Sequence, residues 1–132
     1  MLETGLRGSA ESKVVKKNTA MQVGSGSVPV FATPMLVALM ENAAINALAG
    51  KLSQGQTSVG TMVEIKHLAA TPVGMVVRAQ AELTAIDGGR LTFRVEAFDQ
   101  KEKVGEGTHE RFILELDRFL ARVEAKAQEF SR

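Results

Sequence analysis

The sequence predicts an α+β domain in which an antiparallel sheet of about five strands wraps around one long central helix. Residues 34–49 carry apolar side chains on nearly every face of a helix, which indicates a buried helix. Four later segments alternate apolar and polar residues with period two, as half-buried antiparallel strands do. A length of 132 residues suits a single domain over residues 1–132.

The N-terminal part of the chain has the weakest pattern. Residues 1–10 are polar, and we expect them to be loose. Residues 11–20 could form a first strand, and residues 23–30, VGSGSVPV, are typical of a Gly/Ser-rich loop.

The central helix has clear boundary signals. Thr33 is a suitable N-cap, and Pro34 suits the first helical position because its missing N–H is not needed there. Gly50 is placed to end the helix. A helix that is apolar all round needs cover from a strongly curved sheet or from a second subunit, so we expect a dimer.

The strands are expected at residues 57–69, 75–86, 90–98 and about 103–115. A hairpin turn at Asp87–Gly88–Gly89 joins the second and third of them. The alternation in the first strand gives one face to Val59, Val63, Ile65 and His67, and the other to Ser58, Glu64 and Lys66. Residues 116–130 repeat apolar side chains at helical spacing and predict an amphipathic C-terminal helix.

Composition excludes several classes of function. The 16 basic and 15 acidic residues leave a net charge of +1, which argues against nucleic-acid binding. With no cysteine and only two, distant histidines, the sequence has no recognisable metal site, and we expect no metal and no cofactor. The N-terminus has no apolar run, and polar residues interrupt the apolar stretch 31–49. We therefore expect a cytoplasmic protein without a membrane span.

Two residues interrupt the apolar pattern. Glu41 is a carboxylate in the middle of the buried helix, and His67 lies on the inward face of its strand. Each has an ordinary structural explanation, as a side chain that reaches water or as a hydrogen-bonded core residue. His109 and Arg111 share another strand face, which suits either a solvated sheet edge or part of a site.

The stretches VFATPMLVALMENAA, GTMVEIKH and GTHERF resemble the fluoroacetyl-CoA thioesterase group of the hot-dog superfamily, over roughly residues 11–115. In that group a Thr before the central helix, a Glu within it and a His on the next long strand are catalytic. The resemblance implies the catalytic residues Thr33, Glu41 and His67, at spacings of 8 and 26 residues. It also implies that Gly60 and Arg111 bind substrate near the acyl group, and that the protein is a hot-dog acyl-CoA thioesterase.

The loop before the helix departs from that group. The fluoroacetyl-CoA enzyme has an aromatic lid over its acyl pocket, but this chain has Ser27 at the expected position, and Phe31 is the first ring available. We therefore expect hydrolysis of a short or small acyl-CoA without tight selection of the fluorinated group.

Several alternatives stay open at this point. Glu41 could activate water as a general base or attack the carbonyl itself. An ideal helix separates Thr33 and Glu41 by roughly 12 Å, so substrate, an irregular first turn or a second subunit must connect them. The protein could also be a non-catalytic hot-dog module that binds acyl thioesters. A hydratase is a weaker alternative, because no His precedes His67. The homodimer could further assemble into a tetramer.

Overall fold

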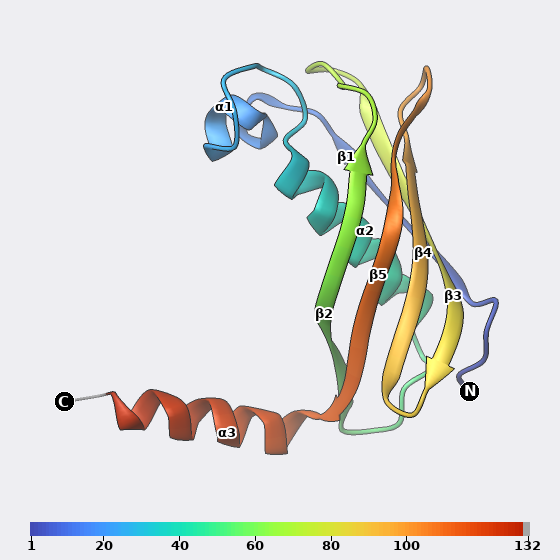
Figure 1. Cartoon of the computed structure of the whole chain (residues 1–132), viewed down its shortest axis with the longest axis vertical. Coiled ribbons are helices and arrows are strands. Elements are labelled where there is room, and N and C mark those ends of the chain that lie inside the picture. The colour runs from blue at the N-terminus through green and yellow to red at the C-terminus, as the bar shows by residue number, and fades with distance from the viewer. Residues whose placement is uncertain (131–132) are drawn as a thin grey trace.

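The computed structural model describes residues 1–130 and contains one five-stranded antiparallel sheet with the order β1-β3-β4-β5-β2. The strands are β1 (Arg7–Lys13), β2 (Gln56–His67), β3 (Val76–Asp87), β4 (Arg90–Phe98) and β5 (Lys103–Glu115). The helices are η1 (Lys16–Asn18), α1 (Ala20–Val23), α2 (Thr33–Ala47) and α3 (Leu116–Glu129). The sheet curls around α2, and α3 projects away from it (Figure 1).

The N-terminal predictions were partly wrong. The chain is ordered into β1 from Arg7 and pairs with β3, so residues 7–10 are not loose. β1 ends at Lys13, and the expected strand over 11–20 is replaced from Lys16 by η1 and α1. The Asn18 side chain explains this turn, because its Oδ1 accepts a hydrogen bond from the Val15 N–H at 2.9 Å and its Nδ2 donates to the Lys13 carbonyl.

Helix α2 begins one residue earlier than expected. Ala32 is the N-cap and Thr33 is the first helical residue, so Thr33 does not cap the helix. The Thr33 hydroxyl bonds to a histidine side chain instead. Only one face of α2 is buried in this chain, and Ala38, Asn42 and Ile45 on the other face are exposed. The all-round apolar helix is therefore only half covered by its own sheet.

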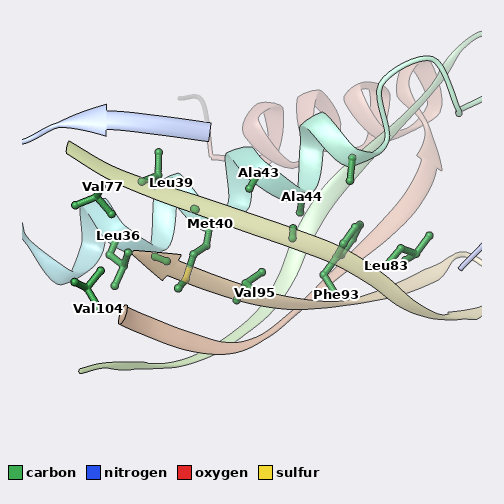
Figure 2. Close-up of a cluster of buried hydrophobic side chains, with 14 of the residues drawn as sticks. Leu36, Leu39, Met40, Ala43, Ala44, Val77, Leu83, Phe93, Val95 and Val104 are labelled. Carbon is green, nitrogen blue, oxygen red and sulfur yellow. The ribbon is translucent and has the colours of Figure 1, made fainter. Parts of the chain in front are cut away.

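The core lies between α2 and the concave face of the sheet. Figure 2 shows Leu36, Met40 and Ala44 of α2 against Val95 and Phe93 of β4. Inward residues are buried at every second position from Val77 to Leu83 in β3 and from Leu91 to Ala97 in β4, as the alternation predicts. Each large apolar side chain buried in this way stabilises the fold by ~1.5–3 kcal/mol.

Strand β2 contains a β-bulge at Thr61. Gly60 pairs with Arg111 and Met62 pairs with Glu110, so Thr61 has no partner of its own in the ladder. Ser58 and Gly60 before the bulge therefore share the inner face with Val63, Ile65 and His67 after it. The predicted face was right for Val63, Ile65 and His67 but wrong for Val59 and Ser58, which exchange sides.

Helix α3 extends over Leu116–Glu129, close to the expected 116–130, and none of its residues is buried. It follows β5 directly and leaves the sheet at the end where Glu115 of β5 pairs with Gln56 of the edge strand β2 (Figure 1). Leu120 and Val123 are about half exposed, at 51% and 48%. Among the described residues, no helix has the length and apolarity needed to cross a bilayer.

Candidate active site

Thr33 and His67 form a direct pair at one end of α2. The Thr33 Oγ1 and His67 Nδ1 atoms lie 2.7 Å apart, joining the first turn of the helix to the last residue of β2. Burial lowers the pKa of His67 and so favours its neutral form. A neutral imidazole beside a hydroxyl can accept or donate a proton, depending on its tautomer.

The other ring nitrogen of His67 is unsatisfied. Nε2 is buried and has no hydrogen-bond partner anywhere in residues 1–130. An unpaired buried polar atom costs about 1–3 kcal/mol, so such atoms mark places where a further group binds. A pocket of about 360 Å³ adjoins the pair. Its lining is mainly apolar and consists of Ala20, Ser25, Gly26, Val28, Val30, Phe31, Thr33, His67, Leu68, Ala69 and Ala70.

Glu41 lies in the middle of α2, beside the buried guanidinium of Arg111. Its Oε2 atom is 3.8 Å from Arg111 Nη1, and the side chains are 37% and 6% exposed, respectively. The carboxylate therefore has a fixed positive charge on one side and is open on another. This environment leaves the carboxylate accessible to water or substrate.

Gly60 provides the space that Glu41 occupies. A Cβ atom at position 60 would lie 2.7 Å from Glu41 Oε2, 3.2 Å from His109 Cε1 and 3.3 Å from Arg111 Nη1. Any side chain would therefore displace the carboxylate. The glycine is required here by close approach, because its backbone conformation is one that other residues also adopt.

Arg111 is held from three directions. Its Nε donates to Ser58 Oγ at 2.8 Å, and its Nη2 donates to the Ser58 carbonyl at 3.0 Å. Its Nη1 donates to His109 Nε2 at 3.2 Å. Burial lowers the pKa of Arg111, and the charge of Glu41 opposes this shift.

The structure thus brings the predicted residues into two groups. Thr33 meets His67, and Glu41 meets Gly60 and Arg111. Along α2 the two groups are about 12 Å apart, because Thr33 and Glu41 stand eight residues apart in one regular helix. One chain alone does not unite all three predicted catalytic residues.

Two further residues belong to the Glu41 group. Ser58 was assigned to the outer face because strict alternation was continued through the bulge at Thr61, although the glycine beside it, Gly60, is a signal of a bulge inside a strand. His109 is only 1% exposed and Arg111 5%, so the alternative of a solvated sheet edge is wrong. His109 and Arg111 stand two residues apart on β5 and therefore share one face of the strand. This shared face was the signal that could have identified His109.

The structure supports the departure noted in the loop before α2. Ser27 is exposed and has no ring, and Phe31 lines the pocket but is 1% exposed and packed in the core, so neither acts as a free aromatic lid. For metals, no group of three His, Asp or Glu side chains in the described part of the chain is arranged to hold an ion.

Comparison with known proteins gives consistent results. A family model described as "Fluoroacetyl-CoA-specific thioesterase" matches residues 14–117. The fluoroacetyl-CoA thioesterase of Streptantibioticus cattleyicolor is 45% identical over 97 residues, which cover 74% of this chain and 70% of that protein.

Solved structures agree with this match. A fluoroacetyl-CoA thioesterase structure superposes with a TM-score of 0.88 at 37% identity, covering 96% of this chain and 98% of the other. A thioesterase superfamily member from Thermus thermophilus gives 0.91 at 30% identity, covering 98% and 96%. The predicted hot-dog fold is confirmed.

Proposed function

Because the chain belongs to the fluoroacetyl-CoA-specific thioesterase family and is an acyl-CoA thioesterase, we propose that Glu41, Thr33 and His67 carry out its reaction. The substrate is a short or small acyl-CoA, which is hydrolysed to the free acid and CoA. The observation that carries this assignment is the open carboxylate of Glu41 held beside a buried arginine. A non-catalytic acyl-binding module has no need of such a group.

In the proposed reaction, Glu41 takes a proton from water while the water oxygen attacks the thioester carbonyl carbon. The carbonyl oxygen becomes an oxyanion, which N–H donors near the start of α2 stabilise. The tetrahedral intermediate then expels the CoA thiolate, which receives a proton from the Glu41 acid or by way of His67. Gly60 and Arg111 line the acyl end of the substrate beside Glu41.

A carboxylate that attacks the carbonyl directly would form a mixed anhydride instead. The general-base route never places the water oxygen in Glu41, whereas the nucleophilic route does so when water attacks the Glu41 carbonyl of the anhydride. A single turnover in ¹⁸O-water, followed by mass spectrometry of the peptide containing Glu41, tests for that label. We expect no label in Glu41, and label there would establish the nucleophilic route.

We further propose that the site is completed by two-fold dimerisation through the edge strand β2. An antiparallel pairing of two β2 strands centred on Glu64, with Thr61 as the extra residue of the bulge, would set His67 opposite Gly60 of the partner subunit on the inner face. Because Gly60 adjoins Glu41, this register joins the two groups that one chain leaves about 12 Å apart. The uncovered face of α2 and the exposed apolar side chains of α3 give such a dimer further surface to bury.

Mixing two inactive variants tests this shared site. Glu41→Gln and His67→Ala should each lose turnover as pure homodimers. After subunit exchange, each mixed dimer would contain one intact site, so about a quarter of wild-type activity should return at equal concentrations. No recovery, although mixed dimers are detected by mass spectrometry, would mean that each site lies within one subunit.

Glu41→Gln alone tests the role of the carboxylate. The amide keeps its size but removes the base, so kcat should fall by about 10²-fold or more. Near-wild-type turnover in a variant with a normal circular dichroism spectrum would remove Glu41 from the mechanism. A cytoplasmic location and a tetramer of two dimers remain part of the proposal, to be checked by cell fractionation and solution scattering.

A further inference from the structure

We propose that His109 is a positioning residue, which fixes Arg111 and through it the carboxylate of Glu41. The proposal rests on the proposed role of Glu41. His109 lies on β5, two residues before Arg111, and is 1% exposed. Its two ring nitrogens are both in hydrogen bonds within the chain, so it is not expected to contact substrate itself.

The partners of His109 determine its protonation. Nδ1 lies 2.8 Å from the Met62 carbonyl oxygen, which can only accept, so Nδ1 carries the hydrogen. Nε2 lies 3.2 Å from Arg111 Nη1, which can only donate, so Nε2 accepts. His109 is therefore the neutral Nδ1–H tautomer. Protonation at Nε2 would direct a second donor at the guanidinium.

This tautomer makes His109 a directional acceptor for Arg111. Ser58 holds the Nε and Nη2 side of the guanidinium, and His109 holds Nη1. The same Nη1 atom is 3.8 Å from Glu41 Oε2, a distance at which charge rather than a hydrogen bond acts on the carboxylate. The position of that charge therefore depends on the acceptor that orients Nη1.

The surroundings of His109 fix its ring in turn. The β-bulge at Thr61 lies next to Met62, whose carbonyl accepts the Nδ1 hydrogen. The ring also stacks on Phe93, with centroids 6.2 Å apart. A continuous chain of contacts thus runs from the bulge through His109 and Arg111 to Glu41.

Two substitutions separate the two nitrogens. In His109→Gln the side-chain amide reaches the region of Nε2, where its oxygen can accept from Arg111. In His109→Asn the amide reaches only the region of Nδ1, where it can donate to Met62 and leaves Arg111 without its acceptor. We expect His109→Asn to lower kcat tenfold or more with little change in KM, and His109→Gln to stay within a few-fold of wild type.

A structural role predicts a different ranking. If His109 only stabilises the fold, kcat should follow thermal stability, and Val95→Ala, a buried substitution on β4, should behave like His109→Asn at equal loss of Tm. Equal kcat for the Asn and Gln variants, or a lower kcat for Gln, would overturn the proposal. Glu41→Gln in the same assay separates this failure from failure of the proposed mechanism, because only the latter leaves Glu41→Gln active.

A measurement on the wild-type protein does not depend on variant folding. The chain has only two histidines, so ¹⁵N-edited NMR of the imidazoles gives two ring systems, assigned with His67→Ala. We expect His109 to carry its hydrogen on Nδ1 at neutral pH. A ring protonated at Nε2 would overturn the proposal, because it could not accept from Arg111.

Discussion

Gly60→Ala is the most direct test of how closely the site constrains Glu41. The added Cβ would lie 2.7 Å from Glu41 Oε2, whereas ordinary contact begins at about 3.4 Å. The carboxylate must therefore move by about 0.7 Å, the difference between these distances. It lies at the far end of a flexible side chain, so it can move while the backbone stays in place.

The expected effects on stability and on turnover are very different. An alanine at a compatible backbone position gains up to ~1 kcal/mol from the unfolded state, which offsets the crowding, so Tm should stay within about 4 °C. A misplacement of about 1 Å at a reacting group costs up to ~10²-fold in rate. A displacement of 0.7 Å should therefore lower kcat by ~10–10²-fold, or ~1.4–2.7 kcal/mol.

The assay is steady-state hydrolysis of acyl-CoA, with free thiol as the readout and Tm measured on the same samples. Gly89→Ala, in the β3–β4 hairpin, is the matched control. The added Cβ would lie 3.0 Å from the exposed ring of Phe112 on β5. The control should keep its turnover. Wild-type kcat in a folded Gly60→Ala variant would refute the argument that the position of the Glu41 carboxylate limits the reaction.

Three further outcomes are expected. The protein should not strongly prefer fluoroacetyl-CoA over acetyl-CoA in kcat/KM, because Ser27 and the buried Phe31 leave no free ring over the pocket. A preference of several thousandfold would contradict this. The free energy of unfolding in urea should fall as pH drops below about 6.5, because burial lowers the pKa of His67 and His109 and the unfolded chain then binds more protons. This loss should level off below their folded pKa, and a flat profile between about pH 7.5 and 5.5 would contradict the assignment. Ser58→Ala should cost ~1–3 kcal/mol of unfolding free energy, since Arg111 Nε loses its acceptor in the interior, and urea unfolding that matches wild type would argue against that bond.

Much of the fold could be predicted because local pattern and tertiary structure agree. The period-two alternation of β3 and β4 survives in the burial of their side chains, and the apolar run after Pro34 forms α2. The strand β1 was misplaced because its polar residues form an edge, where pairing with β3 rather than burial sets its limits.

The site was harder to predict because its geometry depends on tertiary details. The bulge at Thr61 reverses the side of the sheet to which Ser58 points, and Gly60 beside it is a weaker signal than the regular alternation of the strand. The pairing of Thr33 with His67 joins residues 34 apart and uses a hydroxyl that appeared suited to a cap. The resemblance to the thioesterase group identified the residues, but only the folded chain assigns them to two groups.

The position of β2 at the edge of the sheet has a consequence for the order of folding. The β3–β4 and β4–β5 pairs are hairpins between neighbouring strands, whereas β2 must close a loop of about 50 residues to pair with β5. Contacts of such long sequence separation form slowly, so we expect β2 to join a sheet that is already in place. Ser58 and Gly60 would then reach His109 and Arg111 only after the β3–β4–β5 sheet has formed. In a refolding experiment, enzyme activity should consequently appear after most of the strand signal has been regained.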